Sequence, residues 1–213
     1  PAGVDPRAWH LLAIFVATIV GIIGKALAMG AVAVIGIFAT AATGVLSIDE
    51  ALSGFSNSTI WLIAIAFFIS RGFIKTGLGR RIAFGFVKLL GKRTLGLAYG
   101  LAATDLVLAP AIPSNTARSG GVVFPIMNAL AHAYGSDPDK GTARKIGAYL
   151  TLTAYNVCVI TSAMFVTAMV ANPLAVKLAG GQNIHISWIG WASAAIVPGL
   201  VSLIVIPLLI YVV

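Results

Sequence analysis

The sequence has little charge for its length. Only 9% of its 213 residues are charged, whereas 59% are hydrophobic and the mean hydropathy is +1.01. Because a soluble domain carries about 25% charged residues, too few charges are present to cover a water-facing surface. This composition excludes a soluble enzyme, a disordered chain and a nucleic-acid-binding domain, and it predicts an integral membrane protein.

Cysteine and acidic residues are also scarce. Cys158 is the single cysteine, which excludes an internal disulfide and a cysteine-based metal cluster. The 14 basic residues outnumber the six acidic ones, but they lie between long apolar runs, as the loops of a membrane protein do, and form no stripe for a nucleic acid. The sequence has no GxSxG elbow, His-Glu-x-x-His motif or aspartate pair, so we do not expect an enzyme.

Long apolar runs are abundant, and runs of about 20 residues cross a bilayer as helices. The first three occupy residues 9–24, 28–45 and 60–73. We therefore assign residues 1–75 to a scaffold of transmembrane helices and residues 186–213 to a final transmembrane helix. The chain begins at Pro1 and stops inside an apolar run, so we expect further parts of the protein beyond it.

Residues 76–93 have a different pattern, in which basic side chains are spaced among apolar ones. No acidic residue occurs between Arg71 and Arg93. This predicts a basic amphipathic arm helix that lies flat in the membrane interface, on the side with anionic lipid. Placing it in the cytoplasm and alternating the spans leaves only Arg7 and Lys177 among the loop cations outside, which supports this orientation.

Residues 94–130 must then leave and return to the same side of the membrane. In one arrangement they form two short full spans with Pro113–Thr116 in an outer loop. In the other they form a re-entrant hairpin with a Ser-Asn-Thr tip at mid-membrane, where irregular backbone is stable only if it lines a protein cavity. The residues leave both arrangements open, and we favour the hairpin.

The Ser-Asn-Thr tip can bind ions. Ser114, Asn115 and Thr116 are residue types that cap the start of a helix. A helix start offers unpaired N–H groups to a carboxylate, while the end of the preceding arm offers carbonyl oxygens to a sodium ion. The simpler alternative is an ordinary turn followed by a capped helix.

Residues 146–176 are too long for one simple span. As a straight helix they would reach about 46 Å, against a hydrocarbon core of about 30 Å. Asn172-Pro173 predicts a break in this transmembrane helix, and Thr161, Ser162 and Thr167 add polar groups near it. The alternative is a proline kink in which the hydroxyls bond to their own helix.

Arg118 and Asp105 are charged residues inside apolar segments, where charge is costly. Arg118 either adds positive potential for an anion or pairs with Asp105, and we favour a supporting role. Asp105 is the partner of Arg118, a proton-linked carboxylate or a residue beside a water-filled crevice. These alternatives stay open.

A family resemblance makes these features more specific. The first signature hairpin of the divalent anion–sodium symporter family resembles residues 113–126, PSNTARSGGVVFPI. Three further stretches are similar to the dicarboxylate branch of that family: PRAWHLLAIFVATIVGII (Pro6–Ile23), WLIAIAFFISRGFIKTGLGRRIA (Trp61–Ala83) and KRTLGLAYGLAATDLVLAPAIPSNTARSGG (Lys92–Gly121). This branch includes plastid 2-oxoglutarate/malate translocators and bacterial citrate and tartrate permeases.

The resemblance implies an inverted-repeat transporter of which this chain is one half. It implies sodium symport or exchange of di- or tricarboxylates such as malate, 2-oxoglutarate and citrate, by an elevator-like motion, in a homodimer within a bacterial inner membrane or a plastid inner envelope. Ser114, Asn115, Thr116 and Pro173 would contact substrate, and sodium would bind at Ser114, Asn115, Ala171 and Asn172.

One departure from the family pattern concerns sodium. Many relatives carry a Gly-Thr-Pro-Pro-type loop where this chain has Ala171-Asn172-Pro173. Sodium coupling and anion exchange are therefore both kept as expectations, without a further cofactor. The second Ser-X-Thr hairpin of the family does not occur here, which leaves a transport-inactive structural subunit as the alternative function.

Overall fold

The computed structural model describes residue 3 and residues 5–212. Its α-helices are α1 (Pro6–Ile23), α2 (Met29–Ala42), α3 (Ile48–Leu52), α4 (Ser58–Lys75), α5 (Leu78–Leu90), α6 (Thr94–Leu108), α7 (Asn115–Arg118), α8 (Phe124–Ala133), α9 (Ile146–Met164), α10 (Ala171–Gly180) and α11 (Trp188–Val212). Its 3-10 turns are η1 (Ser53–Ser56), η3 (Pro138–Lys140) and η4 (Val166–Ala168), and η2 (Ser119–Val123) is a π-helix.

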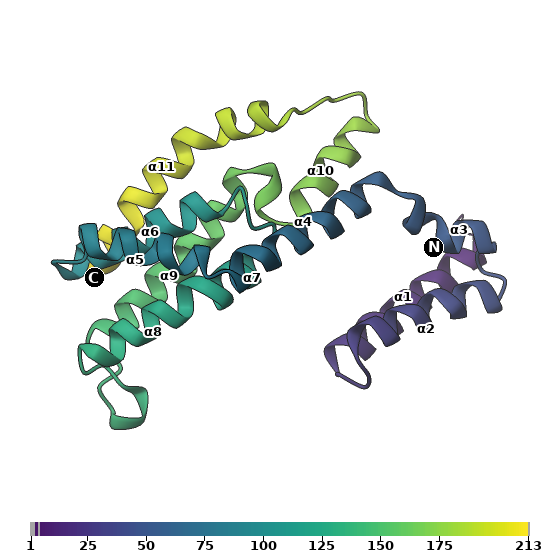
Figure 1. Ribbon diagram of the computed structural model, residues 1–213. Coiled ribbons are helices and arrows are strands. Elements are labelled where there is room, and N and C mark those ends of the chain that lie inside the picture. The colour runs from purple at the N-terminus through teal and green to yellow at the C-terminus, as the bar shows by residue number, and fades with distance from the viewer. Residues whose placement is uncertain (1–2, 4, 213) are drawn as a thin grey trace. The chain divides into compact units, whose positions relative to one another are not determined.

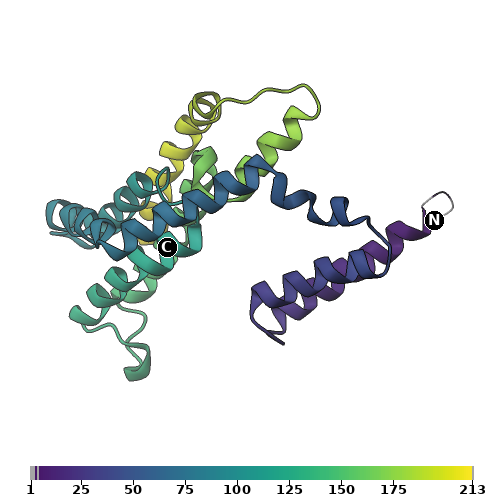
Figure 2. The same ribbon diagram turned by 45° about the vertical axis from the view of Figure 1, so that its right-hand side comes forward.

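Every regular element in the described part of the chain is a helix, which confirms the all-α membrane class. Four of these helices are long and apolar enough to cross a bilayer: α1, α4, α9 and α11. The chain divides into two compact units between Trp61 and Leu62, and Figures 1 and 2 show their helices from two directions.

In the first unit, α1 and α2 pack against each other as a helical pair. Gly36 allows their close approach, because a Cβ there would collide with the hydroxyl of Thr18. The predicted span 28–45 is helical over α2 only, and at about 21 Å a 14-residue helix is shorter than the ~30 Å core. Residues 1, 2 and 4 of the predicted scaffold lie outside the described residues.

The short helix α3 begins with a capping box. The backbone N–H of Ser47 donates to Glu50 Oε2 at 2.9 Å, and the Ser47 hydroxyl accepts from the backbone N–H of Glu50. The Ser47 N–H holds the pKa of Glu50 below its ordinary value, because it stabilises the ionised carboxylate.

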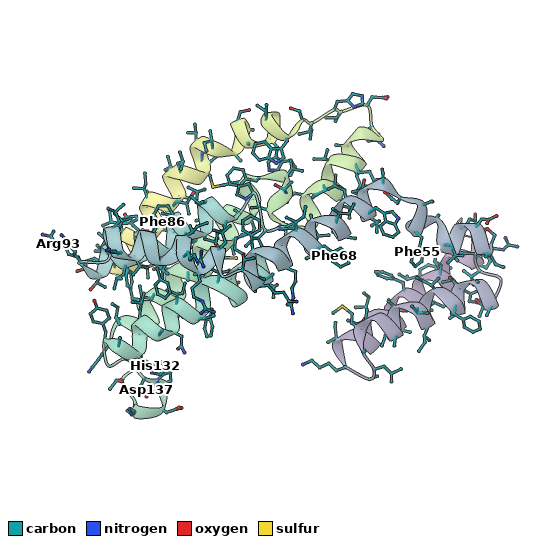
Figure 3. All side chains as sticks on the ribbon, in the orientation of Figure 1. Phe55, Phe68, Phe86, Arg93, His132 and Asp137 are labelled. Atoms are coloured by element: carbon teal, nitrogen blue, oxygen red, sulfur yellow. The ribbon has the colours of Figure 1, made fainter. Side chains whose placement is uncertain are left out.

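In the second unit, α6 is the central helix and contacts α5, α9 and α11. Its leucines Leu97, Leu101 and Leu108 are almost fully buried in a core that also contains residues of the second hairpin arm and α9. The predicted arm 76–93 forms α5, which buries Gly79 and Ala83 against this core. Arg93, in the turn to α6, is exposed and points away from the unit (Figure 3).

A short loop, residues 109–114, joins two helical arms. The first arm is α6, and the second runs without interruption through α7, η2 and α8. Both arms pack along α9, which continues the chain after the loop that holds Asp137, and His132 lies near the end of α8 (Figure 3). The second arm ends at Ala133, slightly beyond the predicted limit of residue 130.

The helix predicted to be broken is interrupted between α9 and α10, and α10 continues to Gly180. Phe165 and Met169 have extended backbones on either side of η4. The interruption therefore precedes Asn172-Pro173, which corrects the predicted position. Both residues lie in the first turn of α10, where proline is tolerated because the first four N–H groups of a helix have no intrahelical partner.

Candidate functional site

The second hairpin arm begins with a capped helix, as the residue types predict. Ser114 is the N-cap, and its hydroxyl accepts from the backbone N–H of Ala117 at 3.1 Å. Asn115 Oδ1 accepts from the backbone N–H of Thr116 at 2.8 Å. Asn115 and Thr116 are exposed, so the start of this arm faces open space.

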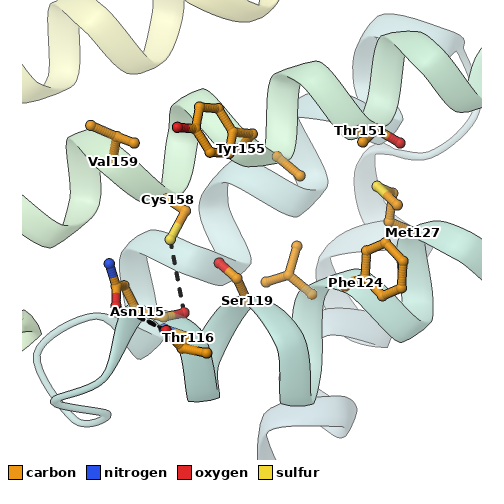
Figure 4. Close-up of a pocket in the computed structure, with 11 residues that line it drawn as sticks. Asn115, Thr116, Ser119, Phe124, Met127, Thr151, Tyr155, Cys158 and Val159 are labelled. Atoms are coloured by element: carbon orange, nitrogen blue, oxygen red, sulfur yellow. Dashed lines mark hydrogen bonds between the residues drawn. The ribbon is translucent and has the colours of Figure 1, made fainter. Parts of the chain in front are cut away.

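A pocket of about 390 Å³ opens beside this helix start (Figure 4). The hairpin contributes Asn115, Thr116 and Ser119 to it, and α9 contributes Tyr155 and Cys158 on the facing wall. The Cys158 Sγ lies 3.9 Å from the carbonyl oxygen of Asn115 and links the two walls (Figure 4). Pockets of roughly 300–1,000 Å³ accommodate small molecules, so the space is large enough for one.

Arg118, in the same helical turn as Asn115 and Thr116, is fully buried. Its Nε donates to Asp105 Oδ1 at 2.8 Å in an ion pair. Its other N–H groups donate to the carbonyl oxygens of Ile112 (3.2 Å) and Ala168 (3.1 Å) and to the hydroxyls of Thr161 (3.2 Å) and Ser162 (3.0 Å). All five N–H groups of the guanidinium are thus paired.

Asp105 is the partner of Arg118, and the structure supports that reading over a crevice position. Only 1% of Asp105 is exposed. One carboxylate oxygen accepts from Arg118 and the other accepts from the hydroxyl of Thr161. Because the positive charge of Arg118 is neutralised inside the protein, it adds little potential for an external anion.

The break between α9 and α10 is held by side chains on both sides. Asn172, which is buried, donates its amide to the carbonyl oxygens of Ser162 (2.7 Å) and Phe165 (2.8 Å). Thr167 donates its hydroxyl to the carbonyl oxygen of Pro110 at 2.8 Å. The break and the loop before the hairpin tip therefore lie side by side.

The structure brings most of the predicted residues together. Asp105, Arg118, Thr161 and Ser162 form one network, while Asn172 and Thr167 attach the break to it and to the hairpin loop. In the described part of the chain, no hydrogen bond joins Ser114, Asn115 or Thr116 directly to Ala171, Asn172 or Pro173. Arg118 links the first turn of the second arm to the break by its bond to Ala168, and Thr167 links the break to the loop before the tip.

Sequence reasoning did not identify the α9 wall of the pocket. Thr151, Tyr155 and Cys158 line it at spacings of four and three residues, which is the spacing of one helix face. That periodicity was available in the sequence. The backbone acceptors of Arg118 carried no such signal.

The site offers neutral oxygen ligands and helix starts. Over the described residues, no group of three His, Cys, Asp or Glu side chains is placed to hold a metal ion. Hydroxyl, amide and carbonyl oxygens suit a hard monovalent cation, and the starts of α7 and α10 suit a carboxylate.

Comparison with known proteins gives a consistent picture. The family model described as the sodium:sulfate symporter transmembrane region matches residues 1–213. The chain is 61% identical to the putative malate transporter YflS of Bacillus subtilis, over 99% of this chain and 44% of that protein. It is 54% identical to dicarboxylate transporter 1, chloroplastic, of Spinacia oleracea, over 100% of this chain and 38% of that protein.

A third relative is the inner membrane protein YbhI of Escherichia coli, which is 45% identical over 99% of this chain and 46% of that protein. The chain thus spans less than half the length of these three relatives.

Proposed function

The chain belongs to the sodium:sulfate symporter family, and from this membership and its own geometry we propose that it is part of a membrane transporter of small di- and tricarboxylates. Malate and 2-oxoglutarate are the first candidates, because the similar proteins include ones named as malate and dicarboxylate transporters. Citrate is a third candidate of the same chemistry.

One observation carries the proposal: the capped start of the second hairpin arm opens into the pocket between that arm and α9. A substrate carboxylate placed there would meet Asn115 and Thr116 at the positive end of a helix. The start of α10, at Ala171–Pro173, provides a second such end on the neighbouring broken helix.

The dimensions of the first arm favour a re-entrant hairpin. With 15 residues α6 is about 22 Å long, shorter than the ~30 Å hydrocarbon core. A hairpin tip at that depth lies within the membrane, where its irregular backbone needs the protein cavity beside it.

The coupling ion is the second part of the proposal. We place sodium at the oxygen atoms of Ser114, Asn115, Ala171 and Asn172, because neutral oxygens suit this ion and the network of Arg118 keeps the hairpin tip and the break together. Symport with sodium and exchange of one anion for another are the two modes to be separated by experiment. In either mode, we propose that the hairpin and the broken helix move as one body.

The test is uptake of radiolabelled malate, 2-oxoglutarate and citrate by liposomes that contain the intact protein, with and without sodium. Asn115→Ala should raise the KM for the transported anion about tenfold or more, since a hydrogen bond to a charged group contributes about 1.5–3 kcal/mol. Asn156→Ala is the matched control, because that amide donates to Leu152 of its own helix. Uptake that requires a sodium gradient would indicate symport.

If the protein is a structural subunit without transport activity, we expect no uptake and no effect of the Asn115 substitution. If the intact protein moves none of the three anions and Asn115→Ala leaves every property unchanged, the transport proposal is wrong.

A further inference from the structure

We propose that Arg118 is a positioning residue, which seats the hairpin tip against the break between α9 and α10 without touching the substrate. The kinetic part of this inference rests on the proposed transport function, whereas its structural part does not.

A substrate carboxylate would need a free N–H group on Arg118. The side chain has none to offer, because its five N–H groups reach five acceptors at 2.8–3.2 Å and its exposed fraction is 0%. Its charge is already paired with Asp105. Any direct contact with substrate would break bonds that the buried guanidinium cannot replace.

The five acceptors come from separate parts of the hairpin and the broken helix. Asp105 lies on α6, and Ile112 lies in the loop before the tip. Thr161 and Ser162 lie on α9, and Ala168 lies in η4 within the break. Arg118 itself ends the first turn of the second arm, so its position fixes that turn relative to all of these segments.

Two features indicate that Arg118 fixes the position of the hairpin tip in particular. Arg118 follows Asn115 and Thr116 in the same turn, and the π-helix η2 begins immediately after it. A π-helix lacks regular α-helical bonding and occurs often at functional sites. The side-chain bonds of Arg118 therefore anchor the turn that carries Asn115 and Thr116, directly before the irregular helix η2.

The reactivity of Cys158 can report whether the hairpin tip is in its observed position. It is half-buried, and its Sγ lies 3.9 Å from the carbonyl oxygen of Asn115. If the hairpin tip moves away from α9, this thiol becomes more exposed, and that change does not depend on transport activity. The rate at which N-ethylmaleimide modifies Cys158 thus measures the geometry directly.

The experiment compares wild type, Arg118→Lys, Asp105→Asn and Thr161→Val in the intact protein, with Arg144→Lys as the control in an exposed loop. Lysine keeps the charge but offers three donors in place of five, so it cannot serve all acceptors. We expect Arg118→Lys and Asp105→Asn to raise the labelling rate of Cys158 severalfold, read by mass spectrometry of the peptide that carries it. Both should also raise the KM for malate more than they lower the maximal rate.

The Asp105→Asn variant distinguishes a positioning role of Arg118 from direct contact between Arg118 and the substrate. If Arg118 bound substrate, its release from Asp105 would leave the KM unchanged or lower it, which would overturn the inference. Labelling of Cys158 at the wild-type rate in a folded Arg118→Lys protein would overturn it as well. Raised labelling in a protein that transports no anion would support the positioning role while the proposed transport function fails.

Thr161→Val covers the case in which the charged variants do not fold. This near-isosteric change removes one acceptor of Arg118 and one donor to Asp105 but keeps the ion pair. We expect a smaller increase in Cys158 labelling, and an unchanged rate in this variant would then decide against the inference.

Discussion

The side-chain amide of Asn172 joins the start of α10 to the end of α9 and to the break between them. It donates to the carbonyl oxygens of Ser162 and Phe165 from a position that is 5% exposed. Asn172→Ala leaves both carbonyls without this donor, and each unsatisfied buried group costs about 1–3 kcal/mol. We expect a clearly lower melting temperature in detergent, measured by tryptophan fluorescence.

Asn128→Ala is the control for this prediction, because Asn128 is exposed on α8. Asn172→Asp should be at least as damaging as alanine, since it places a carboxylate against two carbonyl oxygens. A melting temperature for Asn172→Ala equal to that of the control variant would show that the break is held by other contacts.

The role of Arg118 shows what a sequence reveals at this scale. Because charge is costly in an apolar segment, the sequence indicates that Arg118 needs a polar partner. Pairing with Asp105, 13 residues away, is one of the two roles that the sequence suggests for Arg118, and the structure shows this pair. The other acceptors lie as far as 50 residues away, and two of them are backbone carbonyls. Every residue type carries a carbonyl, so no sequence pattern could have identified those two.

At the scale of elements, close packing of α5 on α6 depends on glycine. A Cβ at Gly96 would collide with the carbonyl oxygen of Leu90, a backbone atom that cannot rotate away. We expect Gly96→Ala to separate the two helices and to lower the stability of the protein in thermal unfolding. The loss should be on the order of 1–3 kcal/mol, as for other overpacked sites.

Gly85→Ala is the matched substitution within the same helix pair. A Cβ at Gly85 has no neighbour within 4 Å, and Gly85 is exposed inside α5. Alanine is better than glycine in a helix interior by roughly 0.5–1 kcal/mol, so this variant should be neutral or more stable. Equal destabilisation by both changes would refute the packing argument.

The outer face of α5 makes a separate prediction about lipid. Arg81 and Lys88 are exposed on it, and among the described residues neither forms a salt bridge. A basic residue near an anionic surface contributes about 1 kcal/mol. The double variant Arg81→Gln, Lys88→Gln should therefore retain less phosphatidylglycerol, measured by native mass spectrometry.

Arg7→Gln combined with Lys177→Gln is the control for charge alone. Both of these residues are exposed, and the orientation argument places them on the opposite side of the membrane. If the two double variants lose bound lipid equally, α5 is not a specific lipid-facing element.

The broken helix shows why element boundaries are harder to predict than elements. Length alone indicated that residues 146–176 do not form one straight span. Proline predicts a break at Asn172-Pro173, but Pro173 lies in the first turn of α10, where its missing N–H has no cost. The break at residues 165–170 is set by long-range bonds such as Thr167 to Pro110, which the local sequence does not encode.

For the whole molecule, composition was the most reliable guide. The scarcity of charge and the long apolar runs are properties of the entire chain and do not depend on any single contact. They predicted the all-α membrane class, which the helices confirm. The resemblance carried by the Ser-Asn-Thr hairpin predicted the family, which the match over residues 1–213 confirms. The shape of the pocket depends on how α9 packs against the hairpin, and composition contains no such information.

The path of residues 94–130 through the membrane gives the last prediction. Two full spans would place Thr116 in an outer loop, whereas a re-entrant hairpin keeps it within the bilayer. We expect Thr116→Cys, in an intact protein whose native cysteines are replaced by serine, to resist an impermeant maleimide added from outside. Malate should reduce any labelling from the cytoplasmic side, because it would occupy the pocket beside this residue.

Two control positions calibrate the reagent on each side of the membrane. Asp49→Cys should react only from outside and Asp139→Cys only from the cytoplasm, since both residues are exposed, in α3 and η3, and the charge distribution assigns these two short segments to opposite sides. If Thr116→Cys reacts from outside as fast as Asp49→Cys, residues 94–130 form two full spans. The 15 residues of α6 would then have to cross a locally thinned bilayer, because their length of about 22 Å falls short of a normal core.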